Sequence, residues 1–163
     1  ELFTADKAGL LNDAGIARRA IMFVYSNLSF EELKPILPAI HQAILEPAPS
    51  GIMFANEIRD AGLALFAKHK VSQGLELSAD YVRNMKKHGS QKRILIVLKL
   101  IESYGVHAHR VIPSLKETAE YFEKYEEGFP KKLSIGKAAD VRKSIEKIMS
   151  LTNKPDLIQI NKL

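Results

Sequence analysis

The clearest helical pattern in this chain is SQKRILIVLKLI, residues 90–101. Its apolar residues recur at i, i+3, i+4 and i+7, the spacing that places side chains on one face of an α-helix. The residues of this stripe are Ile94, Val97, Leu98 and Ile101. Leu95, Ile96 and Leu100 add apolar side chains off the stripe. The pattern therefore predicts a central helix that is covered on several sides.

The same period recurs along most of the chain. Further amphipathic segments cover residues 16–24, 36–44, 58–66, 75–82, 111–122 and 135–148. Ser90 stands at the expected N-cap of the 90–101 helix, and Gly105 has the character of its C-terminal cap. No series of alternating apolar residues or hairpin turn predicts a β-sheet. We therefore expect an all-α fold.

Two prolines predict an irregularity in the second of these helices. Ser29 and Glu32 have the spacing of a capping box at its start. Pro35 and Pro38 follow, and the second of them lies too far along to be accommodated in the first turn. The sequence therefore predicts a bend or a restart around residues 34–38.

Several short segments resemble one another. They are Ala17–Phe23, Ile58–Ala64, Val141–Ile145 and, more weakly, Gln91–Ile94. Each of the first three combines a small or aliphatic residue, an arginine, a polar residue and a small residue. Arg18 and Arg59 are 41 positions apart, a separation within the period range of helix-pair repeats.

These features resemble HEAT repeats over roughly residues 14–150. In that family the first helix of a pair often carries proline or a bend, and the second carries the aliphatic–arginine pattern. The resemblance implies a right-handed α-α superhelix of stacked antiparallel helix pairs, about three pairs here. The phasing of the pairs is left open. We expect one α-helical repeat domain over residues 1–155 and an extended C-terminal tail over residues 156–163.

A second resemblance concerns residues 50–63, SGIMFANEIRDAGL. They are similar to helical extensions of large bacterial proteins, some of which are labelled acetylesterases. This resemblance implies an accessory domain of a larger hydrolase whose catalytic part lies upstream. Because the chain begins with Glu1 rather than Met, we expect a fragment of a longer protein, either cytoplasmic or exported with its signal outside this sequence.

Composition narrows the function classes. The chain has 163 residues, of which 46% are hydrophobic and 26% charged, the mixture of a globular domain. The lack of cysteine excludes disulfides, thiolate nucleophiles and cysteine-bound zinc. Lys and Arg outnumber Asp and Glu by five, and cations gather between Arg83 and Lys99 without an intervening acid. No apolar run has the length of a membrane span.

Residues with catalytic or metal-binding chemistry form no convincing pattern. His107 and His109 are two positions apart, a spacing that points them to different faces of a helix, so a shared metal is not expected. Ser50 lacks the Gly-x-Ser-x-Gly pattern of a nucleophile elbow. The carboxylates lie on exposed helix faces with lysine partners. We therefore expect no catalytic residue, no cofactor and no metal.

The expected function is that of a non-catalytic helical-repeat scaffold or protein-interaction module, which binds a protein or a neighbouring domain of the same polypeptide and no membrane. The candidate partner-binding residues are Met53, Phe54, Arg59, Lys68, Lys86, Lys87, Lys92 and Arg93. Two alternatives remain: the hydrolase accessory domain and, less favoured, nucleic-acid binding through the basic segment 83–99.

Overall fold

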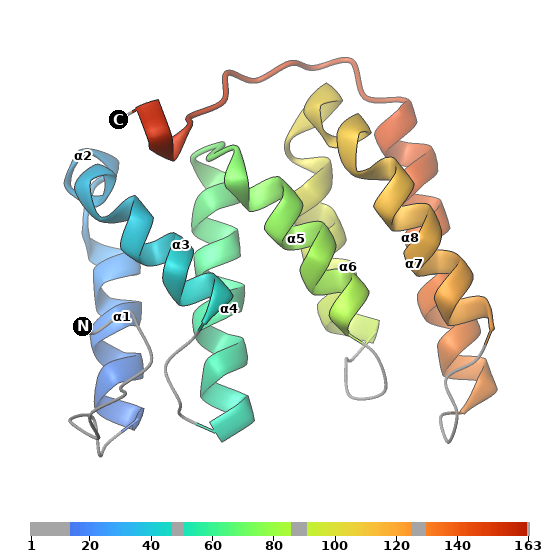
Figure 1. The fold of residues 1–163 in the computed structure, drawn as a ribbon, viewed down its shortest axis with the longest axis horizontal. Coiled ribbons are helices and arrows are strands. Elements are labelled where there is room, and N and C mark those ends of the chain that lie inside the picture. Colours follow the sequence, from blue (N-terminus) through green and yellow to red (C-terminus); the bar gives the residue numbers. More distant parts are fainter. Residues whose placement is uncertain (1–13, 47–50, 86–90, 125–129, 163) are drawn as a thin grey trace. The chain divides into compact units, whose positions relative to one another are not determined.

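The structure, a computed structural model, describes residues 14–46, 51–85, 91–124 and 130–162. Every helix or strand assigned there is an α-helix or a 3-10 helix, apart from one isolated β-bridge between Val71 and Ile158 (Figure 1). The all-α prediction is thus confirmed for this part of the chain. None of the helices described has both the length and the apolar character needed to cross a membrane. Four residues discussed above lie outside the described residues: Ser50, Lys86, Lys87 and Ser90.

The chain divides into two compact units, residues 1–73 with 158–163, and residues 74–157. The elements of the first unit are α1 (Ala14–Asn27), α2 (Phe30–Leu33), η1 (Lys34–Ile36), α3 (Leu37–Leu45), α4 (Gly51–Lys68) and η3 (Ile160–Lys162). Those of the second are α5 (Gln73–Asn84, beginning at the boundary), α6 (Gln91–Glu102), η2 (Gly105–Val111), α7 (Ile112–Glu123) and α8 (Lys131–Met149). The single domain over residues 1–155 stays a prediction.

Helix α4 is the centre of the first unit, because it packs against both α1 and α3. The apolar side chains buried in these contacts include Ile21, Tyr25, Leu37, Ile40, Ile44, Ile58, Leu63 and Phe66. Arg59 of α4 donates from Nε to the Ile44 carbonyl oxygen at 2.8 Å and from Nη2 to that of Leu45 at 3.3 Å. Those carbonyls lie at the C-terminal end of α3, where helical partners are lacking, so Arg59 caps α3.

The start of α2 has the predicted capping box. The Glu32 N–H donates to Ser29 Oγ at 3.4 Å, and the Ser29 N–H donates to a Glu32 carboxylate oxygen at 2.8 Å. These hydrogen bonds lower the pKa of the Glu32 carboxyl. Pro35 then lies in the 3-10 turn η1 and Pro38 in the first turn of α3. The helix therefore restarts at the prolines, as the sequence predicts.

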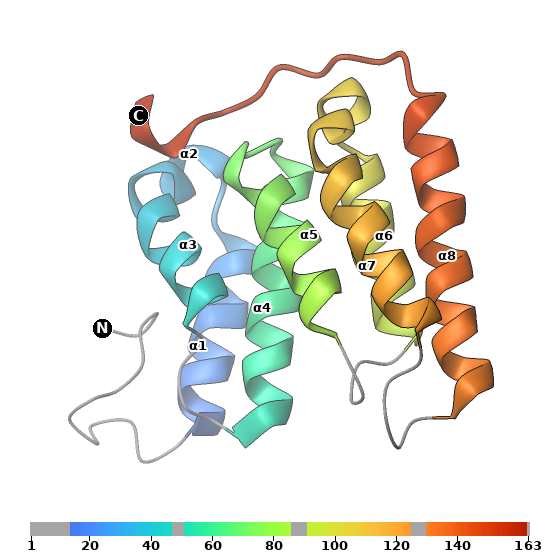
Figure 2. The ribbon, with the colours of Figure 1, turned by 45° about the vertical axis from the view of Figure 1, so that its right-hand side comes forward.

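The second unit has two layers, with α5 and α7 on one side and α6 and α8 on the other (Figure 2). Helix α8 packs against both α7 and α6, and η2 contacts all three. Arg142 of α8 donates to both carboxylate oxygens of Glu123 on α7, at 2.5 and 2.8 Å. The apolar side chains buried here include Leu75, Val82, Ile94, Val97, Leu98, Ile101, Leu115, Phe122, Val141, Ile145 and Ile148.

Two sequence predictions about burial are wrong in this unit. Leu95 and Ile96 are 39% and 50% exposed, so α6 is covered on its stripe but not on several sides. Ile135, whose apolar side chain begins the predicted amphipathic segment 135–148 and is predicted to face inward with it, is 46% exposed. The physical reason is that α6 and α8 bury one face each within their unit, and an aliphatic residue off that face stays in solvent.

Residues 150–162 contribute backbone hydrogen bonds to both units. In the second unit, the Val106 N–H donates to the Asn153 carbonyl oxygen at 2.9 Å. In the first unit, the Ile158 N–H donates to the Lys70 oxygen at 2.9 Å, and the Ser72 N–H donates to the Ile158 oxygen at 2.7 Å. These last two bonds form the isolated bridge with Val71. The C-terminal segment is thus docked by its backbone at each end.

Candidate functional site

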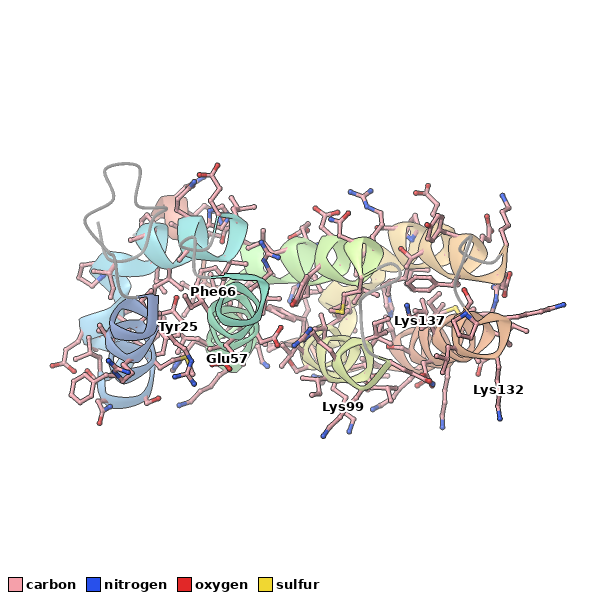
Figure 3. All side chains as sticks on the ribbon, turned by 90° about the horizontal axis from the view of Figure 1, so that it is seen from below. Tyr25, Glu57, Phe66, Lys99, Lys132 and Lys137 are labelled. Atoms are coloured by element: carbon pink, nitrogen blue, oxygen red, sulfur yellow. The ribbon has the colours of Figure 1, made fainter. Side chains whose placement is uncertain are left out.

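The surface formed by α6 and α8 in the second unit combines exposed cations with exposed aliphatic side chains. We call it the α6–α8 face, and its residues are Lys92, Leu95, Ile96 and Lys99 of α6 with Lys132, Gly136, Ala139 and Lys143 of α8. Within each helix, these residues follow the first by three, four, seven or eleven positions, a spacing that places their side chains on one outward-facing stripe. Figure 3 shows Lys99 and Lys132 pointing away from the layer of α5 and α7.

A groove of about 390 Å³ runs between the two helices of this face. Its lining residues are Leu95, Leu98, Lys99, Glu102, Asp140, Lys143, Ser144 and Lys147. Lys99 stands on the α6 wall and Lys143 on the α8 wall. Neither forms an ion pair with a carboxylate in the described residues. The groove therefore offers two lysines outside ion pairs, together with the Asp140 carboxylate, which forms no ion pair with a described residue either.

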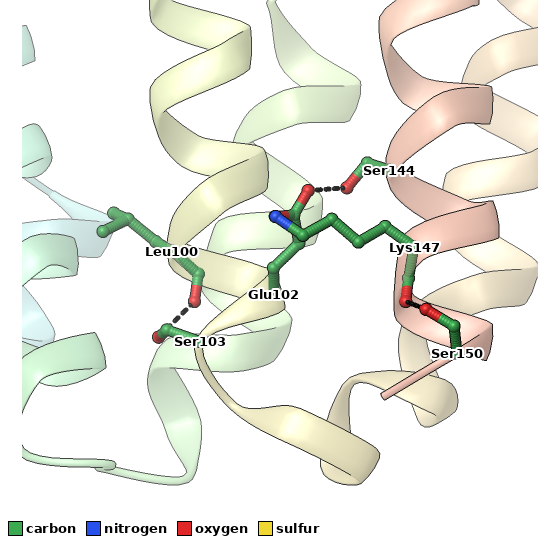
Figure 4. Close-up of polar contacts among 6 residues, drawn as sticks. All are labelled: Leu100, Glu102, Ser103, Ser144, Lys147 and Ser150. Atoms are coloured by element: carbon green, nitrogen blue, oxygen red, sulfur yellow. Dashed lines mark hydrogen bonds and ion pairs between the residues drawn. The ribbon is translucent and has the colours of Figure 1, made fainter. Parts of the chain in front are cut away.

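Polar contacts near the two ends of the groove hold α6 and α8 together. Near the start of α6, Gln91 Nε2 donates to the Asp140 carboxylate at 2.6 Å. At the end of α6, Glu102 accepts a hydrogen bond from Ser144 Oγ at 2.9 Å and forms an ion pair with Lys147 (Figure 4). Later residues of α6 thus meet later residues of α8, which means that the two helices run in the same direction.

Of these two sets of contacts between α6 and α8, the stronger is the one that the Glu102 carboxylate makes. Its side chain is only 12% exposed, and it bridges two residues of α8 that are one turn apart. A charge-assisted hydrogen bond to a buried hydroxyl contributes more than an exposed ion pair does. Because Glu102 already neutralises Lys147, the cations left to attract a ligand are those of Lys99 and Lys143, with Lys92 and Lys132 nearby.

The predicted partner-binding residues are distributed over both units, and whether they form one site stays a prediction. Arg59 is half-buried and bonded to α3, while Lys68 is exposed at the end of α4. Both belong to the first unit. Lys92 is exposed on the α6–α8 face, and Arg93 is half-buried beside it in the chain. The remaining predicted residues lie outside what the structure describes: the side chains of Met53 and Phe54, and all of Lys86 and Lys87.

Sequence reasoning missed the contribution of α8. Lys132, Gly136 and Lys143 are separated by four and seven positions, a helical spacing that could have placed them on one face. What the spacing could not supply is that this face adjoins α6. That juxtaposition follows from the contacts of Gln91 and Glu102 with α8.

A buried lysine in the same unit has a different role. Lys137 is 1% exposed, and its ammonium lies 5.3 Å from the centre of the Phe122 ring, within the range of a cation–π contact. One turn earlier, Ser134 Oγ donates to the Phe122 carbonyl oxygen at 2.8 Å. Both residues of α8 therefore serve the contact with α7.

His107 and His109 contact backbone carbonyl oxygens rather than each other. His107 Nε2 lies 2.9 Å from the Pro155 carbonyl oxygen, and His109 Nε2 lies 2.9 Å from that of Ile148. Each ring thus attaches η2 to the end of α8 or to the segment beyond it. Within the described residues, no group of three or more His, Asp or Glu side chains is arranged to hold a metal ion.

Two further hollows each have a cation that is already in an ion pair. One, of about 400 Å³, lies between α5 and α7 and is lined by Arg83, Asn84, Glu117, Thr118 and Tyr121. Arg83 there already pairs with Asp80 at 2.9 Å. The other, of about 580 Å³, is lined by Lys34, Pro35, Pro38, Ile160 and Lys162, and Lys34 is paired with Glu31 at 2.7 Å.

Comparison with known proteins supplies no relative: no family model, no curated protein and no solved structure matches this chain.

Proposed function

We propose that this chain is a protein-interaction module made of stacked antiparallel helix pairs, similar to HEAT repeats, and that the α6–α8 face is its contact surface. The observation that carries the function is the pair Lys99 and Lys143, outside ion pairs with the described residues and on the two walls of one groove, beside the exposed Leu95 and Ile96. Exposed aliphatic residues ringed by polar ones are typical of protein-binding surfaces.

The repeated arginines support the helix-pair part of the proposal. Arg59 of α4 bonds to the end of α3, and Arg142 of α8 bonds to Glu123 of α7. In each case the arginine-bearing helix follows the proline-bearing one, with Pro38 in α3 and Pro113 in α7. This order favours α3 with α4 and α7 with α8 as pairs, the order that HEAT repeats have.

Arg18 fits the same scheme by a different contact. It forms an ion pair with Glu57, which connects α1 to α4. Arginines at equivalent positions thus each hold their helix against a neighbour. A guanidinium can donate several hydrogen bonds in a fixed geometry. One arginine in each pair could therefore hold its helix against a neighbouring helix throughout the proposed stack.

The face favours a protein over nucleic acid. Nucleic-acid binding depends on a continuous track of cations, whereas the lysines of this face are seven positions apart on α6 and eleven on α8. The exposed Leu95 and Ile96 have no partner in a phosphate backbone, but they would be covered by a protein. If the partner is a neighbouring domain of a longer polypeptide, the accessory-domain hypothesis becomes a special case of the same function.

A photo-crosslinking amino acid placed at Ile96 in the full-length protein tests this function. In cells that naturally produce the protein, we expect a crosslink from position 96 to one defined protein or domain. The matched control position is Lys116, which is exposed on α7. The crosslink should be lost on K99E/K143E. Equal crosslinking from positions 96 and 116, or a crosslink that survives the charge reversal, would contradict the proposal.

A further inference from the structure

We propose that the occupant of the α6–α8 face is an acidic amphipathic helix of the partner protein, an inference that rests on the function proposed above. The groove between α6 and α8, its two lysines outside ion pairs and the exposed Leu95 and Ile96 of the same face together favour this occupant.

The lysines favour acids on both flanks of the occupant, placed to meet Lys99 and Lys143 rather than the Asp140 carboxylate of the same groove. Lys99 rises from one wall of the groove and Lys143 from the other. Lys92 lies two turns before Lys99 on the same stripe, and Lys132 lies three turns before Lys143. None of the four has a carboxylate partner in the described residues. An occupant with Asp or Glu along one edge only would leave one wall uncompensated.

The surface between the lysines requires apolar residues in the middle of the occupant. Leu95 supplies aliphatic surface within the groove, and the exposed Ile96 extends that surface along α6 beside it. On α8, the same face includes the small residues Gly136 and Ala139, which add little side-chain bulk to it. A Cβ added at Gly136 would lie 3.1 Å from Gln91 Nε2, so the Gln91 side chain of α6 packs directly against α8 at this position.

The dimensions match a short helix. At a rise of about 1.5 Å per residue, Lys92 to Lys99 spans roughly 10 Å and Lys132 to Lys143 roughly 16 Å. A partner helix of about 11 residues has the length of the longer row. Apolar residues at i, i+3, i+4 and i+7 would then lie in the groove, and acids on either side of them would reach the two rows of lysines.

The test uses a fluorescein-labelled peptide of about 14 residues, long enough for roughly four helical turns. It has leucines at i, i+3, i+4 and i+7 and glutamates on both flanks. A scrambled peptide has the same composition without a common face. A duplex DNA of similar length is the third probe. Binding of each to the purified protein is followed by fluorescence anisotropy, at low and at high salt.

We expect the ordered peptide to bind at least about ten-fold more tightly than the scrambled one, and its affinity to fall with salt because the lysines are exposed. K99E/K143E should weaken binding by about ten-fold or more. The matched control K116E/K124E changes the net charge equally, in α7 and at its C-cap, and should leave the affinity within about two-fold of the original protein. I96N, which removes exposed aliphatic surface only, should also weaken binding. Circular dichroism verifies that each variant is folded.

Several outcomes overturn the inference: equal binding of ordered and scrambled peptides, equal losses in K99E/K143E and K116E/K124E, or tight binding of DNA in place of the peptide. These outcomes are distinct from failure of the proposed function. If position 96 crosslinks to a protein segment that is neither acidic nor helical, the interaction module stands and the acidic helix is rejected. If peptide binding and the crosslink both fail, both are rejected.

Discussion

Gly62 of α4 lies against Ile44 of α3 so closely that a Cβ at position 62 would stand 2.6 Å from Cγ1 of Ile44 and 3.0 Å from Cδ1. Real Cβ atoms do not come as close as 2.6 Å to a carbon atom of another side chain. Cγ1 belongs to a β-branched side chain, which has little freedom at χ1. The close contact of α3 and α4 therefore depends on glycine at this position.

Gly62→Ala should destabilise the first unit, although alanine is the better helix former. The helix-propensity gain is about 1 kcal/mol, whereas overpacking a buried contact costs about 1–3 kcal/mol. We expect a net loss of about 1 kcal/mol in the free energy of unfolding, measured by urea denaturation. The decisive control is the Ile44→Ala background, in which Gly62→Ala should be neutral or stabilising. Equal effects in both backgrounds would show that Ile44 is not the obstacle.

Local structure in the first unit could be predicted from the sequence because its causes are local. Ser29 and Glu32 are three residues apart and bond each other directly. Pro35 and Pro38 interrupt the helix at their own positions. Gly62, in contrast, lies inside a repeated segment, and nothing in its neighbours indicates that Ile44 will press against it. Position 62 requires a glycine only because α3 packs on α4.

Gly105→Ala should detach the segment after α8 from η2. Gly105 has a φ of +62°, and a Cβ there would lie 2.1 Å from the Asn153 carbonyl oxygen. A left-handed conformation costs an alanine roughly 1–2 kcal/mol, and the clash also displaces the acceptor of the Val106 N–H. We expect faster amide hydrogen exchange at Val106 and a lower Tm.

The matched control for this substitution is Gly136→Ala. A Cβ there meets only the end of the Gln91 side chain, at 3.1 Å, and the residue lies within α8. The change should be nearly neutral in stability, because the flexible glutamine can move and alanine favours the helix. Unchanged exchange at Val106 in Gly105→Ala would contradict the role assigned to Gly105.

Two histidines make the stability of the first unit depend on pH. His69 stacks on Phe30 with ring centres 4.3 Å apart, and His41 stacks on Phe66 at 6.4 Å. Burial lowers the pKa of both imidazoles below the ordinary value of 6.5, and the neighbouring Lys68 charge lowers that of His69 further. The unfolded chain therefore binds more protons than the folded one in the range between the lowered pKa values and 6.5.

The sign follows from that difference in bound protons. The contribution of these residues is fully present above pH 6.5 and is lost as the pH falls through the lowered pKa values. We expect the urea midpoint of the first unit to decrease between about pH 7 and 5, the range in which histidine titrates. In H41Q/H69Q the decrease should be smaller, because glutamine does not titrate. Parallel pH profiles for the two proteins would show that other groups cause the change.

The candidate site could be predicted only in part. The basic segment 83–99 contains Lys92 and Lys99, and helical spacing alone places both on one stripe of α6. Lys143 is more than forty positions away, so its place on the opposite wall depends on the packing of α8 against α6. The sequence predicts that Leu95 and Ile96 are covered, because an apolar side chain favours burial. The sequence does not indicate whether another residue of the same chain packs over it.

The last prediction concerns the Glu102 carboxylate, which fastens one end of the groove. Ser144 is 4% exposed, so Glu102→Ala leaves its hydroxyl without an acceptor, a loss of about 1–3 kcal/mol. The ion pair with Lys147, whose side chain is 60% exposed, contributes no more than about 1 kcal/mol. A double-mutant cycle should therefore give a larger coupling energy for Glu102 with Ser144 than for Glu102 with Lys147, and only the second should shrink in high salt. Urea denaturation of E102A, S144A, K147A and the two double variants measures both couplings. A larger coupling to Lys147, or equal salt sensitivity, would mean that the exposed ion pair holds α6 to α8, and the groove would then widen as ionic strength rises.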